Sequence, residues 1–128
     1  MRLDNYGPYG SEQAALKAVV ERLVEGLHPV AVYLFGSRAE GRARPDSDFD
    51  LAVVLDDELP DAQTTYEGVY APLLGLGIGC DVIPCKASEF REVLADPSNP
   101  WYDSWRNARK VYQMRKNQRR PRGSTMTQ

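Results

Sequence analysis

Two aspartates in alternate positions follow a Gly-Ser pair after ten residues, and this combination could bind a metal ion and a phosphate. The pair is Gly36-Ser37, and the aspartates are Asp48 and Asp50. Residues i and i+2 of a β-strand point to the same face, so we expect both carboxylates at one spot. Because like charges held together repel, a divalent cation is the natural occupant, and oxygen ligands favour Mg²⁺ or Mn²⁺ over Zn²⁺.

The Gly-Ser pair is suited to hold a phosphate. A glycine lets a phosphate approach the backbone, and the free N–H groups at the start of a helical turn would face an anion. The Ser37 hydroxyl can donate to the same phosphate. We expect Arg38 to contact a triphosphate, with a solvated surface as the alternative, and we expect Arg42 and Arg44 on a solvated loop.

A third carboxylate, Asp81, lies in the otherwise apolar run 80–83. A buried, unpaired aspartate is costly, and a metal ion bound by Asp48 and Asp50 on a neighbouring strand would be a partner for it. Three carboxylates can hold two ions roughly 3.5–4 Å apart, one at each reacting oxygen of a phosphoryl displacement. Simpler interpretations stay open, because Asp48 could belong to a turn and Asp81 could be solvated at a strand edge.

Hydrophobic periodicity predicts the elements that must position these residues. We expect a helix over 12–27 capped by Ser11, a helix over 66–74, a helix capped by Ser88, and a last helix opened by Asn99-Pro100. We expect strands over 30–35, 49–55 and 80–83, a turn of helix and a loop over 38–47, and a short edge strand at 111–112. The predicted fold class is α+β, a small mixed β-sheet covered by helices.

Length and composition set the organisation of the chain. The 128 residues, 42% of them hydrophobic, suit one domain with a modest core. We expect a loose leader over 1–10, one domain over 11–114 and a basic, disordered tail over 115–128. The tail holds five of the 16 Lys and Arg residues and no acid, so 18 acidic and 11 basic side chains remain. An acidic body of this kind makes nucleic acid an unexpected partner.

The sequence favours a cytoplasmic protein with no membrane segment. No stretch approaches the roughly 20 apolar residues of a membrane span, and the N-terminus lacks the apolar core of a signal peptide. Cys80 and Cys85 are the only cysteines and His28 is the only histidine. They do not make a zinc site, and the cysteines are interpreted as small apolar residues in a reducing compartment.

The motif resembles a known signature. Gly36-Ser37, ten residues and then Asp48-Phe49-Asp50 are similar to the Gly-Ser-x(10)-Asp-x-Asp pattern of the DNA polymerase beta-like nucleotidyltransferase superfamily. The resemblance covers about residues 11–114, with a later strand aspartate where Asp81 stands. It is strongest to the stand-alone minimal nucleotidyltransferase (MNT) domains, many of which are antitoxins paired with a HEPN-domain ribonuclease toxin. It implies the polymerase beta-like palm fold.

The resemblance also implies a reaction, the transfer of a nucleoside monophosphate from an NTP to a hydroxyl with release of pyrophosphate. In antitoxin members the donor is ATP and the acceptor is a tyrosine of the toxin. By position, Asp48 and Asp50 would be metal ligands, and Asp81 would be the third ligand and the base for the acceptor hydroxyl. Gly36 and Ser37 would hold the β- and γ-phosphates.

Two other function classes stay open. Enzymes that modify aminoglycosides resemble the chain around the motif but usually carry an extra helical domain for the acceptor. We expect that a chain of 128 residues lacks such a domain and that a partner supplies the acceptor. A non-catalytic antitoxin that acts by occlusion is the other alternative, and the intact carboxylate set weighs against it. Four aromatic residues are expected in core or interface packing and are candidates for a docking surface: Tyr66, Tyr70, Trp101 and Trp105.

Overall fold

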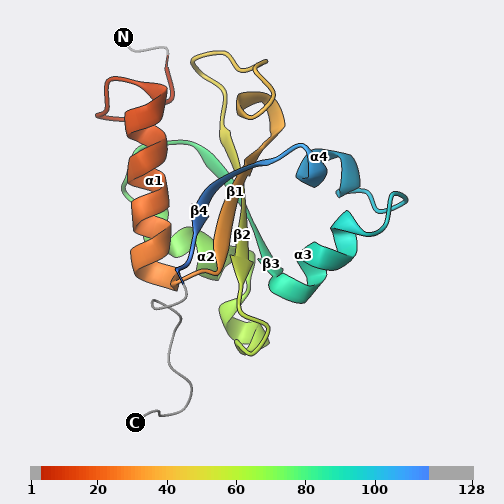
Figure 1. The fold of residues 1–128 in the computed structure, drawn as a ribbon. Coiled ribbons are helices and arrows are strands. Elements are labelled where there is room, and N and C mark those ends of the chain that lie inside the picture. Colours follow the sequence, from red (N-terminus) through yellow and green to blue (C-terminus); the bar gives the residue numbers. More distant parts are fainter. Residues whose placement is uncertain (1–3, 116–128) are drawn as a thin grey trace.

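The computed structural model of the protein describes residues 4–115, in which helices cover both faces of a four-stranded sheet (Figure 1). The helices are α1 (Glu12–Leu27), α2 (Tyr66–Tyr70), α3 (Ala87–Leu94) and α4 (Tyr102–Arg106), and the 3-10 turns are η1 (Gly36–Arg38), η2 (Asp61–Gln63) and η3 (Ala71–Leu73). The strands are β1 (Ala31–Phe35), β2 (Phe49–Leu55), β3 (Cys80–Lys86) and β4 (Arg109–Gln113). The predicted α+β class with a mixed sheet is confirmed.

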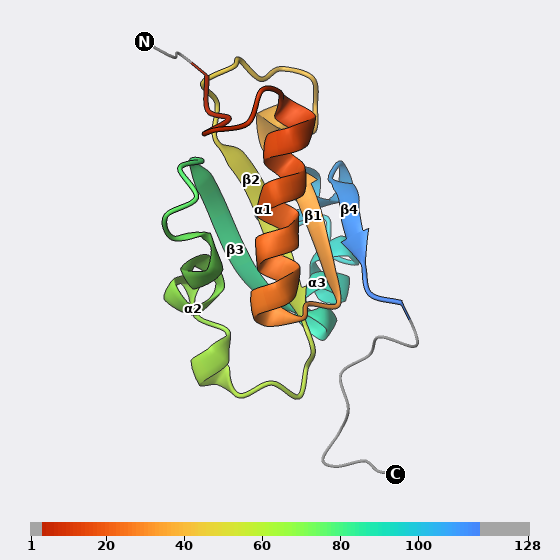
Figure 2. The same cartoon turned by 90° about the vertical axis from the view of Figure 1, so that its left-hand side faces the viewer.

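The sheet has the order β3-β2-β1-β4. Strand β1 is antiparallel to both β2 and β4, whereas β2 and β3 are parallel. Figure 2 shows β3 and β4 at the two outer edges, with α1 lying across the sheet between them. This topology places the end of β1 beside the starts of β2 and β3, so the segments that carry the motif meet at one end of the sheet.

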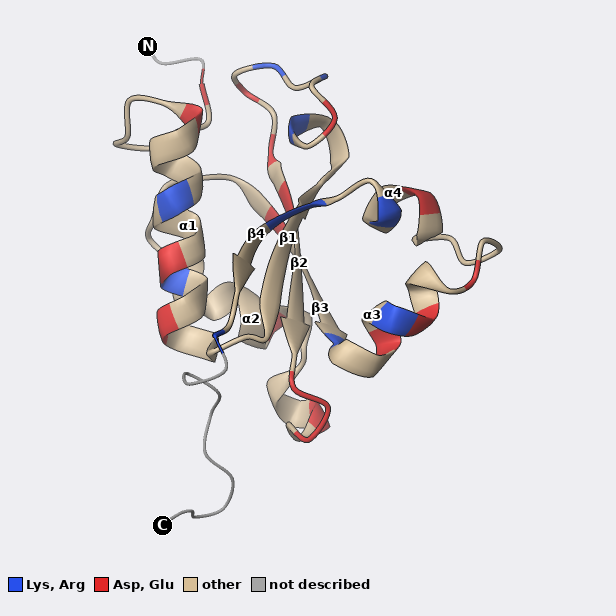
Figure 3. Ribbon diagram, viewed as in Figure 1, with Lys and Arg blue, Asp and Glu red and all other residues tan. Residues whose placement is uncertain are grey.

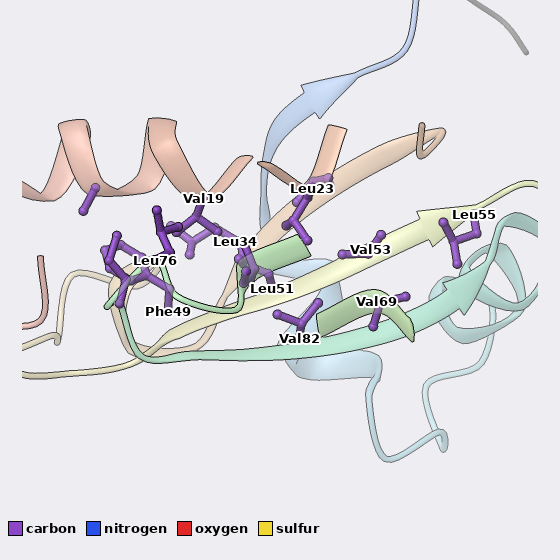
Figure 4. Close-up of a cluster of buried hydrophobic side chains, with 14 residues drawn as sticks. Val19, Leu23, Leu34, Phe49, Leu51, Val53, Leu55, Val69, Leu76 and Val82 are labelled. Carbon is purple, nitrogen blue, oxygen red and sulfur yellow. The ribbon is translucent and has the colours of Figure 1, made fainter. Parts of the chain in front are cut away.

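Two apolar clusters hold the layers together, one on each face of the sheet. Alternate residues of β2, from Phe49 to Leu55, point toward α1 and pack with its buried side chains Val19 and Leu23 (Figure 4). The residues between them point the other way, where Ala52 packs with side chains of α3 and α4. Since side chains alternate along a strand, Asp50 belongs to the face covered by α3 and α4.

Helix α1 spans the residues predicted for it. The Ser11 hydroxyl accepts a hydrogen bond from the Ala14 N–H at 3.1 Å, which satisfies one of the free donors of the first turn. The helix ends at His28, whose φ of 49° is left-handed, and Pro29 follows. The predicted N-cap is therefore confirmed.

Several elements differ from the prediction. Ser88, expected as a helix cap, lies inside α3, whose N-cap is Lys86. Two prolines explain two further differences. The stripe expected as one helix over 66–74 divides into α2 and η3, because Pro72 has no N–H to continue the α-helical ladder. Strand β3 continues to Lys86, three residues beyond the predicted end, and includes Pro84. Proline is tolerated there because β3 is an edge strand.

The predicted leader and the predicted tail can be compared with the residues that the structure describes. Residues 4–10 belong to the segment expected as a loose leader, and they lie against the domain, with Tyr6 and Tyr9 packed on the cluster beneath α1. The segment 116–128 of the predicted tail lies outside the described residues. Within residues 4–115, no helix is both long enough and apolar enough to cross a membrane.

Candidate active site

The register of the sheet brings the three predicted carboxylates to one end of it. Phe35, the last residue of β1, pairs with Asp50, and Asp50 pairs on its other side with Asp81. Asp48 lies two residues before Asp50, directly before β2, so alternation directs both side chains to one side. Figure 3 shows acidic segments of the ribbon where β2 enters the sheet.

The carboxylates are close enough to affect one another. Burial raises the pKa of the Asp50 carboxyl above its ordinary value, and the charges of Asp81 and then Asp48 raise it further. Asp50 is half-buried, while Asp48 and Asp81 are exposed. The expectation of a buried Asp81 is therefore wrong, because β3 is an edge strand. Asp81 belongs to the site because it pairs with Asp50 across the strands, and not because it is buried.

The donor set fits a hard cation, although the side chains do not form a closed cage. Within residues 4–115, no group of three His, Cys, Asp or Glu side chains is arranged to hold a metal ion. Mg²⁺ is usually bound through one or two carboxylates together with water and substrate phosphates, so it does not need an all-protein cage. The oxygen donors of Asp48, Asp50 and Asp81, with mutual repulsion at Asp50, match that requirement.

Two glycines allow these carboxylates to lie against the backbone. Gly36 has a left-handed φ of 75°, and a Cβ at this position would overlap the Oδ2 atom of Asp50. A Cβ at Gly79 would lie 2.5 Å from the Oδ1 atom of Asp48. Gly79 is the last glycine of the stretch that precedes β3. The signal for a role in the site was its position, two residues before Asp81.

Gly36 and Ser37 begin the turn η1 directly after β1. The N–H groups of Ala39 and Glu40 both donate to the Gly36 carbonyl, each at 3.1 Å, which closes the turn. The first N–H groups of such a turn have no partner within it. They lie at the carboxylate end of the sheet, since Phe35 pairs with Asp50, and this arrangement suits a phosphate held beside a cation.

Arg38 is a buried residue in the stretch 36–48, which is otherwise exposed or half-buried. Its side chain is 2% exposed, and its guanidinium lies 4.3 Å from the ring centroid of Phe49. It donates to Glu12 at 2.9 Å and to three loop carbonyls at 2.7–3.2 Å, those of Arg44, Pro45 and Ser47. These contacts hold the loop that leads into Asp48. The guanidinium therefore does not present a free face to a triphosphate.

The other two arginines of this stretch lie on its surface. Arg42 pairs with Glu40 at 3.0 Å, and Arg44 lies 3.5 Å from Asp46. The side chains of both arginines are more than 60% exposed. The expected solvated loop surface is confirmed.

Asn5 joins the two segments that precede the carboxylates. Its side-chain nitrogen donates to the carbonyls of Ser47 at 3.0 Å and Gly79 at 2.8 Å. Its side-chain oxygen accepts from the Gly79 N–H at 2.6 Å. Asn5 could not be predicted from the sequence, because its partners lie 42 and 74 residues away and no local pattern signals them. The starts of β2 and β3 are thus fixed to each other by one amide.

Comparison with known protein families identifies a family for this chain. Residues 15–110 match the family of nucleotidyltransferase domains. No curated protein matches the chain. The chain is also similar to a crystal structure of a presumed nucleotidyltransferase from Sulfolobus solfataricus, at 28% identity and a TM-score of 0.46, over 60% of this chain and 68% of that one. Because the family match spans more than half of the sequence and includes all three carboxylates, the chain belongs to the nucleotidyltransferase domain family.

Proposed function

We propose that this domain transfers AMP from ATP to the hydroxyl of a tyrosine on a partner protein. Membership of the family supports nucleotidyl transfer and an NTP substrate. The observation that carries the proposal is the register Phe35–Asp50–Asp81, which sets three carboxylates beside a glycine-led turn. That combination provides ligands for a cation and a place for the phosphates it would accompany.

Each residue of the site has a role in this proposal. Asp48, Asp50 and Asp81 would hold Mg²⁺ or Mn²⁺, as one or two ions, which when bound would neutralise phosphate charge and orient the reacting oxygens. Ser37 and the N–H groups at the start of η1 bind the β- and γ-phosphates. Arg38, proposed from the sequence as a phosphate contact, instead positions the loop before Asp48.

In this proposal, Asp81 moves the proton. It lies on the exposed edge strand, where a large acceptor can approach it, and its register partner is Asp50. Its carboxylate accepts the proton of the acceptor hydroxyl. The acceptor oxygen then bonds to the α-phosphorus, the bond from that phosphorus to the bridging oxygen breaks, and pyrophosphate leaves.

The partner we propose is a HEPN-type toxin, with this domain as its antitoxin. The basis is the similarity of the motif to stand-alone MNT domains, and the exposure of Asp48 and Asp81 is compatible with a folded acceptor. A site enclosed by the rest of the domain would exclude such a partner. Occlusion without transfer, and transfer to a small molecule, are the competing outcomes of the test.

The experiment uses α-labelled ATP, Mg²⁺ and the protein co-purified from its native host with bound partners. Label on a partner tyrosine, located by mass spectrometry, is the expected result, and γ-labelled ATP should leave no label. Asp50→Asn is the control for catalysis by this site. Transfer to an aminoglycoside with no protein acceptor would support the small-molecule alternative, and neutralisation of a toxin without label would support occlusion.

A further inference from the structure

A groove of about 400 Å³ lies beside the candidate active site, between the α2–η3 segment and strand β3. The segment 80–82 forms one wall, and Tyr66, Tyr70 and Leu74 contribute to the other. Asp81 therefore belongs both to the groove and to the carboxylate cluster. An acceptor held in the groove would lie next to the proposed base.

The far wall presents apolar side chains to solvent. Tyr66 is 61% exposed and Leu74 is 67% exposed, the two highest values among the large hydrophobic residues of the described chain. Trp105, which we expected as a candidate for docking, is 5% exposed and packs in the core with Phe90. The aromatic residues of α2 are thus better placed for contact with a partner than Trp105.

The wall formed by β3 presents backbone groups. The Phe49 N–H donates to the Gly79 carbonyl at 3.1 Å, and β2 is the one described strand beside β3. In a strand the N–H and C=O of one residue point the same way and alternate along the chain. Gly79 and Asp81 therefore face β2, whereas the N–H and C=O groups of Cys80 and Val82 face the groove. Pro84, the next residue in this alternation, has no N–H.

The side chains of β3 alternate between the two faces of the sheet. Val82 packs on the face that carries α1 and α2, while Ile83 and Cys85 pack on the opposite face. Asp81 alternates with Val82 and so shares the face of Asp50. A fifth strand laid along β3 would place the residue opposite Asp81 roughly 5 Å from it, on this face. Its two neighbours would point to the face of Tyr66 and Leu74.

We propose that the acceptor is an extended peptide segment that adds to the free edge of β3. Its hydroxyl residue lies opposite Asp81, and the residues on either side of the hydroxyl are apolar and pack on Tyr66 and Leu74. The charged residues of the groove are Glu67 and Asp81, both acidic, so the segment carries a positive charge. This inference rests on the proposed function, because Asp81 is taken as the base.

The first test measures binding of short labelled peptides by fluorescence anisotropy. The probe is a nine-residue peptide with a Val-Tyr-Val core and lysines at both ends, added with Mg²⁺ and a non-hydrolysable ATP analogue. Each backbone amide is N-methylated in turn. Every second N–H of an added strand would donate to β3, and methylation removes that donor. We therefore expect binding to be lost when either the odd-numbered or the even-numbered amides are methylated, but not both. Binding that is insensitive to methylation at every position would overturn strand addition.

The second test changes the apolar wall. Leu74→Ala and Tyr66→Ala should each weaken peptide binding by about tenfold, or about 1.4 kcal/mol. Leu94→Ala is the matched control, because Leu94 is 40% exposed on α3, on the other side of the sheet. Equal affinities of all three variants for the peptide would overturn the proposal.

Calorimetry with Mg²⁺ and ATP distinguishes failure of the strand-addition proposal from failure of the proposed function. Leu74→Ala and Tyr66→Ala should leave nucleotide affinity unchanged, since neither residue belongs to the donor site. If the unmodified protein binds Mg²⁺ and ATP but no peptide of this class, strand addition is wrong, while the proposed function is not contradicted. If it binds no nucleotide at all, the proposed function itself fails.

Discussion

The carboxylate of Asp50 lies against the backbone of Gly36, so closely that a methyl group on the Gly36 Cα would overlap its Oδ2 atom. The contact arises because Phe35 pairs with Asp50, which sets the first residue of η1 beside the second strand. The two halves of the motif, proposed to bind phosphate and metal, are therefore one physical unit. A change at Gly36 should act on the site through Asp50.

Gly36→Ala should disrupt the site, and Gly41→Ala is its matched control. Both glycines have a φ of 75°, so both substitutions carry a similar strain of roughly 1–2 kcal/mol. A Cβ at Gly41 meets no atom within 4 Å, whereas one at Gly36 displaces Asp50. We expect similar losses in the free energy of unfolding, measured in urea, but loss of Mg²⁺·ATP binding only for Gly36→Ala. Equal nucleotide affinities in the two variants would contradict the contact.

Asp50→Asn should lower the transfer rate by about a thousandfold, or about 4 kcal/mol of transition-state stabilisation, because it removes a proposed metal ligand. Asp48→Asn should behave similarly. In the absence of metal Asp50→Asn should also raise the melting temperature, because burial and the charges of Asp81 and Asp48 disfavour the ionised carboxylate. A variant that turns over normally would remove Asp50 from the mechanism.

Removal of the divalent cation should abolish tight nucleotide binding. The end of the sheet that would receive the triphosphate carries three carboxylates, which repel phosphate unless a cation lies between them. Calorimetric titration of ATP should show binding with Mg²⁺ or Mn²⁺ and none with EDTA. The same affinity in EDTA would show that the carboxylates do not act through a metal.

The sequence predicts those features of the fold and site that depend on local pattern. The bounds of α1 and β2 are as predicted, because an N-cap and an apolar periodicity define α1 and an apolar run defines β2. The convergence of Asp48 and Asp50 follows from strand geometry in the same way. Strand order is not a local property, which is why Asp81 was expected to be buried although β3 lies at an edge.

The residues that support the site could not be predicted from local pattern. The position of Arg38 directly after Ser37 predicts a phosphate contact, but tertiary packing directs its guanidinium to Glu12 and the loop carbonyls. Asn5 lies in a stretch with two glycines and a proline nearby, and its partners at Ser47 and Gly79 come from distant segments. Side chains that hydrogen-bond to distant backbone groups leave no periodic signal in a sequence.

Asn5→Ala should weaken both folding and nucleotide binding. Its amide joins Ser47 to Gly79, and loss of such a bridge leaves partly buried backbone groups without partners, at a cost of about 1–3 kcal/mol. Asn107→Ala is the control, because Asn107 makes one exposed bond to the Asp103 carbonyl and should cost less than about 0.5 kcal/mol. Denaturation in urea and calorimetry with Mg²⁺·ATP measure the two effects. A stability loss without any change in nucleotide affinity would limit Asn5 to a structural role.

The stability of the domain should fall as the pH rises from about 9 to 12, partly through Cys85. Burial raises the pKa of this thiol to about 12 from an ordinary value of 9.0, and Cys85 is 5% exposed. Above pH 9 the unfolded thiol therefore loses its proton while the folded thiol keeps it. The thiol then favours unfolding by up to about 1.4 kcal/mol per pH unit until the folded pKa is reached.

The comparison with Cys85→Ala isolates this thiol from the tyrosines and lysines that titrate in the same range. At pH 8 the variant should be less stable than the unmodified protein, because it leaves a small cavity in the cluster beneath α3. The difference in the free energy of unfolding should shrink as the pH rises to 11. The variant lacks the thiol, so it does not lose the stability that titration of Cys85 removes from the unmodified protein. Urea denaturation at pH 8, 9, 10 and 11 gives the two curves. Curves that stay parallel across this range would mean that Cys85 titrates in the folded protein much as it does in the unfolded chain.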